Sequence, residues 1–439
     1  MKTHPLLAVL ALLGAALISQ PCFGQYSQQG SKLVGTGAVG TAAQGKAVSL
    51  SADGSTAIVG GPGDSGNAGA AWIWTSSGGV WSQQEKLVGS GAIGSAGQGT
   101  SVSLAADGNT AIIGGPGDDG GLGAAWAWTR SAGVWTQQGA KLVGSGIVGS
   151  PSQGRSVSIS ADGNTAIVGG PGDLSSGAAW VWTQSAGVWT QQGPKLVGSG
   201  VVGAGAAQGV AVGLSADGST AIVGGNADNH FAGAAWVWTR SAGVWSQSAK
   251  LIGSGASANA EQGRSVSLSA DGATAIVGGP GDNGTGAAWI WIRVAGIWSQ
   301  QSGKLVGSDG LGGAQGSAVS LAADGNTAVI GGPLADSAAL PFGGFDGNGA
   351  AWVWTRSGAV WTQHSAKLVG SGAAAAAEQG FAVSLSADAN TILVGGPNDR
   401  AGGAVWVFVL GAAEIPALKG VVGVFLLLSL VALALLRLR

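Results

Sequence analysis

Apolar residues occur along most of the chain in short runs, and the runs return in the same order many times. Each unit contains a Val-Ser-Leu-type run, an Ala-Ile-Val-type run, a Trp-x-Trp run and a segment around one further Trp. In the second unit these runs predict strands over 101–105, 110–114, 124–129 and 134–143. Ala-Asp-Gly and Ser-Ala-Gly separate them, and glycine tolerates the positive φ of tight hairpin turns. No ten-residue stretch of this body has a helical period free of glycine, so an all-β body is expected.

The unit is written seven times. It is marked by Lys-Leu pairs spaced 54 or 55 residues apart, with a last spacing of 63, that begin at Lys32, Lys86, Lys141, Lys195, Lys250, Lys304 and Lys367. Six units carry three tryptophans and the seventh carries one, which accounts for all 19. Units of about 55 residues, with four antiparallel strands that are apolar on both faces, are typical of propeller blades.

The two ends of the body carry complementary parts of one unit. Residues 25–34 repeat the fourth-strand sequence with Tyr26 in the Trp position, whereas the last unit stops after its third strand at 406–409. We therefore expect the N-terminal strand to complete the last blade, which removes exposed sheet edges. The sequence predicts a seven-bladed β-propeller over 25–410; an open solenoid is the alternative, but it would not explain complementary ends.

The units resemble FG-GAP repeats, which form the blades of integrin α-chain propellers and of many bacterial surface proteins. The resemblance covers 25–410 and rests on Gly45 before the first strand, Gly60-Gly61-Pro62 after the second, and the third strand 177–182. The Phe of Phe-Gly is replaced by Gln44, Gln98, Gln153, Gln208, Gln262, Gln315 and Gln379. The integrin-type calcium loop Asp-x-Asp-x-Asp-Gly is absent, so the calcium that the family would imply is not expected from that loop.

The first 24 residues have the pattern of a signal peptide. Lys2 precedes an apolar run over 6–18, and Gly24 supplies a small residue for cleavage. The single cysteine, Cys22, lies in this segment, so the mature chain would contain none, which suits an oxidising compartment. We expect export.

The last 20 residues have the pattern of a membrane anchor. Residues 420–436 carry no charge, and 17 residues in a helix reach about 26 Å, enough to span a bilayer. The linker 411–419 before this predicted transmembrane helix (420–439, with its basic tail) contains Ile415, Pro416, Ala417 and Leu418. This segment resembles the Ile-Pro-Thr-Leu variant of exosortase-type sorting tails. The resemblance implies a processing protease and delivery to the cell surface or exopolysaccharide matrix; the alternative is a plain anchor.

Composition narrows the function classes. Charged residues make up 9% of the 439 residues, and 19 Lys and Arg stand against 21 Asp and Glu, for a net charge of −2. No basic stripe is available for a phosphate backbone, so a nucleic-acid partner is not expected. Gly-x-Gly-x-x-Gly recurs, as at 35–40, but no helix follows it, so a dinucleotide site is not expected either.

Two rings of aspartate recur with the repeat. Those in the hairpin turns, such as Asp53, are expected to bond their own backbone two residues on. The second ring follows the second strand of each unit, on the face where blades connect: Asp64, Asp118, Asp173, Asp228, Asp282, Asp336 and Asp399. These carboxylates suggest a hard cation such as calcium, because calcium prefers oxygen ligands; capping of backbone N–H groups is the alternative.

Few residues break the sevenfold symmetry, and catalysis requires groups with different roles. His230 and Phe231 enlarge the fourth unit, and the insertion 334–348 adds Phe342, Phe345 and Asp346. No Ser/His/Asp set or carboxylate pair emerges, so we expect no enzyme and take these five residues as candidate ligand contacts. The function expected is an exported, non-catalytic adhesion module that binds exopolysaccharide or a surface protein through multivalent loops. A purely structural matrix protein and a secreted hydrolase are the alternatives.

Overall fold

The computed structural model describes residues 24–411 except 175, 204, 310–311, 337–346, 375 and 401. Residues 28–409 form one compact unit. The predicted signal peptide, sorting motif and transmembrane segment lie outside the described residues, as do Phe342, Phe345 and Asp346. The part of the chain that is described contains no helix long and apolar enough to span a membrane.

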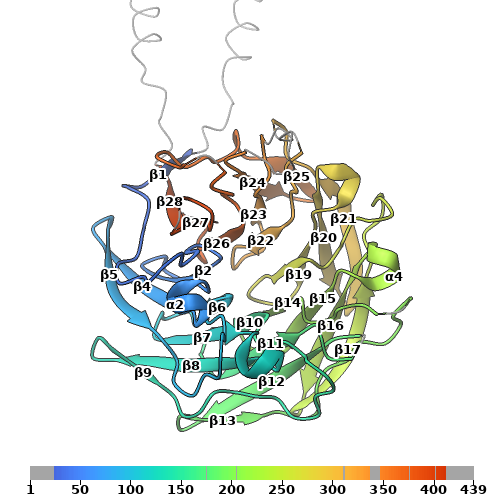
Figure 1. Cartoon of the computed structure of the whole chain (residues 1–439). Coiled ribbons are helices and arrows are strands. Elements are labelled where there is room, and N and C mark those ends of the chain that lie inside the picture. The colour runs from blue at the N-terminus through green and yellow to red at the C-terminus, as the bar shows by residue number, and fades with distance from the viewer. Residues whose placement is uncertain are drawn as a thin grey trace, which may run out of the picture. The chain divides into compact units, whose positions relative to one another are not determined.

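Seven four-stranded antiparallel sheets form a ring, which confirms the all-β seven-bladed propeller (Figure 1). Blade 1 consists of β2 (Ala47–Leu50), β3 (Thr56–Gly61), β4 (Ala70–Ser77) and β5 (Val80–Leu87). The other strands are, in blade 2, β6 (Ser101–Leu104), β7 (Thr110–Gly115), β8 (Ala124–Ser131) and β9 (Val134–Gln137); in blade 3, β10 (Ser156–Ile159), β11 (Thr165–Gly170), β12 (Ala178–Ser185) and β13 (Val188–Gln191); in blade 4, β14 (Ala211–Leu214), β15 (Thr220–Gly225), β16 (Ala234–Ser241) and β17 (Val244–Leu251); in blade 5, β18 (Ser265–Leu268), β19 (Thr274–Gly279), β20 (Ala287–Val294) and β21 (Ile297–Leu305); in blade 6, β22 (Ala318–Leu321), β23 (Thr327–Gly332), β24 (Ala350–Ser357) and β25 (Val360–Gln363); and in blade 7, β26 (Ala382–Leu385), β27 (Thr391–Gly396), β28 (Ala404–Leu410) and β1 (Tyr26–Gln28).

The N-terminal strand completes blade 7, as the complementary ends of the repeat predicted. The strand order in that sheet is β1-β28-β27-β26. The pairing continues beyond the strand, where the N–H groups of Gln29 and Leu33 donate to the carbonyls of Val407 and Val405 at 2.8 and 2.7 Å. The ring is thus closed by hydrogen bonds between segments nearly 380 positions apart in the sequence, and blade 7 has no open edge there.

The expected strands and the observed ones differ at two places. The fourth strand of blade 2 ends at Gln137, and Leu142 pairs separately with Ala125 after a break. Short helical segments, each interrupted by residues with positive φ, lie between the second and third strands of four blades, and the sequence did not predict them. They are α2 (Asp64–Asn67), α3 (Asp118–Gly121), α4 (Asp228–Phe231) and the 3-10 turn η1 (Asp282–Gly284).

The core lies between neighbouring blades and is built around one tryptophan of each third strand. These seven side chains are fully buried: Trp72, Trp126, Trp180, Trp236, Trp289, Trp352 and Trp406. In blade 1, the indole N–H of Trp72 donates to the carbonyl of Thr36 at 2.8 Å, and a Cβ placed on Gly35 would lie 2.4 Å from Trp72 Cδ1. The first glycine of each Gly-x-Gly-x-x-Gly motif therefore admits a buried indole.

The turns between the first and second strands form a second ring around the axis. The N–H of Ala52 donates to the carbonyl of Ala106 at 2.9 Å, and the N–H of Ala387 donates to Ala52 at the same distance. Equivalent bonds join every neighbouring pair around the ring of Ala52, Ala106, Ala161, Ala216, Ala270, Ala323 and Ala387. One end of the propeller axis is therefore held by a continuous circle of backbone hydrogen bonds.

Candidate functional site

The opposite end of the axis opens on the face that we call the loop face, where the connections between blades meet those between the second and third strands. In blade 1, the N–H of Gly63 donates to the carbonyl of Ala42 at 3.0 Å. The N–H of Val39 donates to Asp64 Oδ1 at 2.7 Å. The two kinds of connection therefore share one face, as the sequence predicted.

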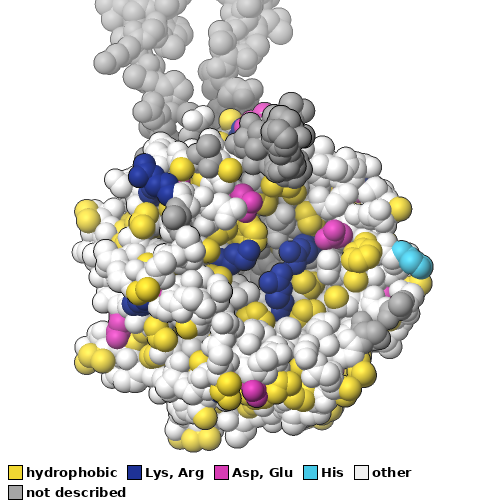
Figure 2. Space-filling model, in the orientation of Figure 1, with side chains coloured by type: hydrophobic (Ala, Val, Ile, Leu, Met, Phe, Trp, Pro, Cys, Tyr) yellow, Lys and Arg dark blue, Asp and Glu magenta, His cyan; other side chains and the backbone are white. Residues whose placement is uncertain are grey.

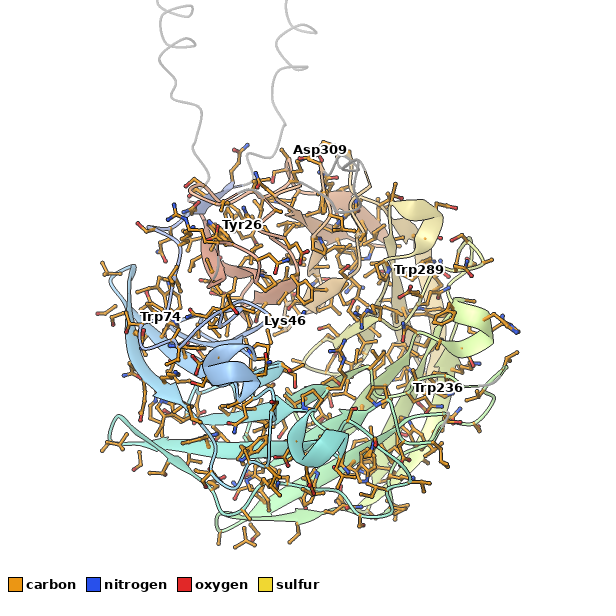
Figure 3. All side chains as sticks on the ribbon, viewed as in Figure 1. Tyr26, Lys46, Trp74, Trp236, Trp289 and Asp309 are labelled. Atoms are coloured by element: carbon orange, nitrogen blue, oxygen red, sulfur yellow. The ribbon has the colours of Figure 1, made fainter. Side chains whose placement is uncertain are left out.

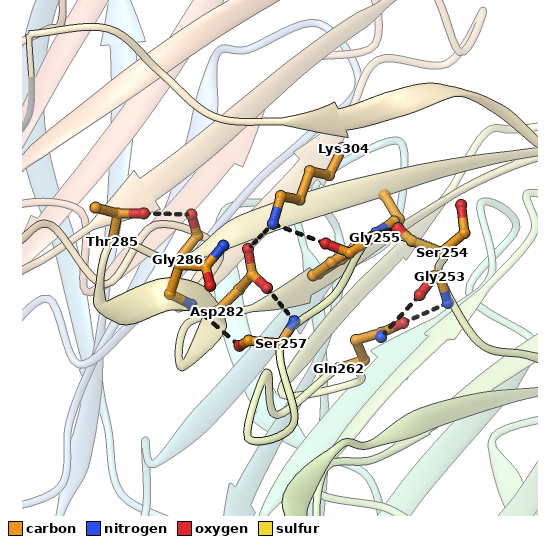
Figure 4. Close-up of polar contacts among 11 residues, drawn as sticks. Gly253, Ser254, Gly255, Ser257, Gln262, Asp282, Thr285, Gly286 and Lys304 are labelled. Carbon is orange, nitrogen blue, oxygen red and sulfur yellow. Dashed lines mark hydrogen bonds and ion pairs between the residues drawn. The ribbon is translucent and has the colours of Figure 1, made fainter.

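The second aspartate ring forms ion pairs on this face, one in each blade. The carboxylate of Asp64 lies 2.7 Å from Lys86 Nζ, and the carboxylate of Asp282 meets Lys304 in the same way (Figure 4). Asp282 Oδ1 also accepts from the N–H of Ser257 at 2.7 Å, and Lys304 donates to the carbonyl of Gly255 at 2.9 Å. The remaining pairs are Lys32–Asp399, Lys141–Asp118, Lys195–Asp173, Lys250–Asp228 and Lys367–Asp336.

These pairs hold the connection that arrives from the previous blade, which is the capping role that the sequence left open. Six of the seven carboxylates are 1–2% exposed, whereas Asp336 is 53% exposed. Within the described residues, no three His, Cys, Asp or Glu side chains are grouped so that they would hold a metal ion. The calcium hypothesis for these seven residues therefore gains no support from the geometry.

Burial raises the pKa of the Asp64 carboxyl, but hydrogen bonds from Lys86, the Val39 backbone and Ser65 outweigh it. The net pKa of Asp64 lies below its usual range, so the group is ionised at neutral pH. In the hairpin turns, Asp53 Oδ1 accepts from the N–H of Ser55 at 2.9 Å, which confirms the expected bond to the backbone two residues on.

The glutamine that replaces the Phe of Phe-Gly ties each inter-blade connection to the next inner strand. Gln44 accepts from the N–H of Gly35 at 2.5 Å and donates to its carbonyl at 2.9 Å. The following Gly45 has φ +86°, and a Cβ there would lie 2.4 Å from the carbonyl oxygen of Ala404. The Gln-Gly pair thus fixes where the innermost strand begins.

The residue after each Gln-Gly lines a cavity on the propeller axis, which we call the axial cavity. Its volume is about 160 Å³, and all seven blades contribute one half-buried side chain. These are Lys46, Thr100, Arg155, Val210, Arg264, Ser317 and Phe381. Lys and Arg side chains gather around the axis in the space-filling view (Figure 2), and Lys46 is labelled there in Figure 3.

A larger cavity of about 480 Å³ adjoins the axial cavity, and Lys46 lines both. It lies over blades 7 and 1 and is called the flanking cavity below. Its polar lining comes from Thr41, Asn67, Asn398 and Arg400. The two cavities therefore share one lining residue, Lys46, on the loop face.

The axial cavity concentrates positive charge. Burial lowers the pKa of Lys46, and the nearby Arg155 lowers it further, whereas Glu378 acts in the opposite direction. Burial also lowers the pKa of the Arg155 guanidinium, with Arg264 as the second cause. Lys46 Nζ lies 3.9 Å from the centre of the Phe381 ring. Among the described residues, no ion pair joins Lys46, Arg155 or Arg264 to a carboxylate.

The candidate contacts chosen from the sequence lie elsewhere. His230 and Phe231 are exposed on α4, with φ of 56° and 67°, and neither lines the axial or the flanking cavity. The sequence reasoning missed the axial residues. Their signal is one column of the repeat, immediately after the constant Gln-Gly, in which the seven units carry six different side chains and three of the units carry a cation.

The ring of seven antiparallel sheets defines the class of this protein, a seven-bladed β-propeller. Residues 245–291, which run from the last strand of blade 4 into the third strand of blade 5, match the sequence model of the FG-GAP repeat family. This match, which covers about one of the seven units, supports the resemblance to FG-GAP repeats that the repeated sequence suggested.

Among solved structures, the chain is similar to hydrazine synthase of Kuenenia stuttgartiensis. The TM-score is 0.55 at 16% sequence identity, and the match covers 88% of this chain and 100% of that one. At this identity the likeness shows the fold alone. No curated protein sequence matches the chain.

Proposed function

We propose that this protein is an exported, non-catalytic binding module of the cell envelope, which holds exopolysaccharide or a surface protein on its loop face. The observation that carries the proposal is that the repeated polar residues and the variable ones have different surroundings. Those repeated in every blade are occupied inside the structure, as Asp64 and Gln44 illustrate, whereas those that differ between blades surround open cavities on one face. Differing side chains around a shared cavity are what a specific binding site requires.

Export and surface placement rest on the chain ends. The signal-peptide pattern over 1–24 and the apolar segment over 420–436 are sequence features that favour delivery to the envelope. The Ile415–Leu418 segment would be the site for a processing protease. The repeated loops encircle the axis, so multivalent display remains part of the proposal, with the cavities as its most specific contact.

Two measurements on the full chain test this function. Producing cells would be probed with an antibody and an external protease, and the purified chain would be tested for binding to the cells' exopolysaccharide and surface proteins, with and without a calcium chelator. Surface exposure with saturable, chelator-resistant binding is expected. An intracellular chain, or one that binds no envelope component, would refute the proposal. Release of new reducing ends from the polysaccharide would favour the hydrolase instead.

A further inference from the structure

The cations of the propeller fall into two groups according to their partners. Seven described lysines pair with the second aspartate ring. Four arginines, Arg130, Arg240, Arg293 and Arg356, lie 5.5–5.6 Å from the ring centres of Trp135, Trp245, Trp298 and Trp361. The cations left in the described part of the chain are Lys46, Arg155, Arg264 and Arg400, and all four line the axial or the flanking cavity.

This placement is electrostatically costly in the empty protein. Three like charges share a cavity of about 160 Å³, and burial and mutual repulsion lower the pKa of both Lys46 and Arg155. The carboxylates on the same face do not neutralise them by direct contact. Glu378 acts on Lys46 only through space, and Glu261 accepts a hydrogen bond from Asn226 at 3.2 Å. A bound anion would remove the repulsion and regain the Coulomb energy in a half-buried site.

The lining indicates which kind of anion fits. Guanidinium groups match oxyanions, because their N–H donors bind two oxygens of one group side by side. The axial cavity has room for about five water molecules at roughly 30 Å³ each, which suits one charged group and not a long segment of chain. The seven inner turns are tied together at the far end of the axis, so we expect the group to enter from the loop face.

The flanking cavity is suited to the rest of the ligand molecule that carries this anionic group. Its 480 Å³ falls within the range of small-molecule sites. Thr41, Asn67 and Asn398 offer hydroxyl and amide groups that both donate and accept, as the hydroxyls of a sugar require. Lys46 stands between the two cavities and is held over the Phe381 ring.

We infer that the axial cavity binds the carboxylate of an acidic sugar, a uronate unit of a polysaccharide, whose ring occupies the flanking cavity. Arg155 and Arg264 hold the carboxylate, Lys46 neutralises it from the side of the flanking cavity, and Phe381 positions Lys46. The inference rests on the proposed function and deepens it, because it names the ligand class and the residues that select it.

Isothermal titration of the full chain in mild detergent with a galacturonate trimer tests this inference. The methyl ester of the same trimer is the matched ligand, since it lacks only the charge. The test variant is the double substitution Arg155→Gln/Arg264→Gln. Its matched control is Arg240→Gln, because Arg240 carries a guanidinium near the turns of the opposite face. Near-ultraviolet circular dichroism checks that each variant is folded. We expect the trimer to bind at least tenfold more tightly than its ester, and the double variant to lose at least tenfold in affinity. Arg240→Gln should leave the affinity within twofold.

Several outcomes would overturn the inference. An ester that binds as well as the acid would remove the role of charge, and equal losses in the double variant and Arg240→Gln would remove the role of the axial cavity. Sodium sulfate that binds as tightly as the trimer would point to a free inorganic ion, and a hexaglutamate peptide that binds more tightly would point to an acidic protein. If the ester binds as well as the acid, the protein would still bind a neutral polysaccharide from the producing cells. The proposed function would then survive although the inference had failed.

Discussion

Removing the lysine from one buried ion pair should destabilise the propeller far more than removing it from the exposed pair. In Lys86→Met, the Asp64 carboxylate stays 1% exposed and keeps its bonds from Val39 and Ser65 but loses its only counter-ion. Removing one partner of a fully buried pair costs about 3–5 kcal/mol. Because Lys86 is itself 19% exposed, we expect a loss of about 2–3 kcal/mol in unfolding free energy.

The matched control is Lys367→Met, in which the same substitution leaves the half-exposed Asp336. Water can solvate that carboxylate, so a loss of about 0–1 kcal/mol is expected. Both lysines also donate to a connector carbonyl, of Gly37 and Asp309 respectively, so that contribution cancels in the comparison.

Urea unfolding followed by tryptophan fluorescence, at several pH values, measures the difference. The pKa of Asp64 is lowered in the folded protein, so its contribution to stability is present above the unfolded pKa of about 3.9 and is lost as pH falls through the folded pKa. The Lys86→Met deficit should therefore be largest at pH 7 and shrink below pH 4. Equal deficits in the two variants, or a Lys86→Met deficit that is unchanged at pH 3, would refute the reasoning.

Three further predictions concern the scaffold. The urea midpoint of unfolding of the unmodified chain should be constant from pH 7 to about pH 5 and should decrease at pH values below about 4. The reason is that the pKa of each of five turn carboxyls is also lowered in the folded protein. These carboxyls belong to Asp53, Asp162, Asp217, Asp271 and Asp388. Gly35→Ala, whose Cβ would lie 2.4 Å from Trp72, should cost more than about 1 kcal/mol in urea unfolding. Gly303→Ala, with open space around it, should be neutral, and equal effects would contradict the packing argument. Deleting residues 25–33 should expose an edge of β28 and cause self-association, seen by light scattering; a monomer with unchanged stability would show that ring closure contributes nothing.

Much of the fold could be predicted because the same pattern of strands and turns recurs in seven units. The strand runs, the Asp-Gly turns and the half-units at the two ends each point to the same closed ring, and Gln29 and Leu33 pair with blade 7 as that argument requires. The short helical segments were missed because three or four residues are too few to show a helical period. The role of the second aspartate ring stayed open because each lysine partner stands at least 22 positions away in the sequence.

The sequence by itself determined the blade, the number of blades and the way that the ring closes, because these depend on local patterns of apolar residues and turns. It did not determine the candidate site. Lys46, Arg155 and Arg264 are more than 100 residues apart from one another, and each belongs to a different unit. Only closure of the ring brings the residues after Gln-Gly to one axis, where burial and mutual repulsion change their electrostatics. The repulsion between these cations depends on the distances between them, and only the tertiary structure sets those distances.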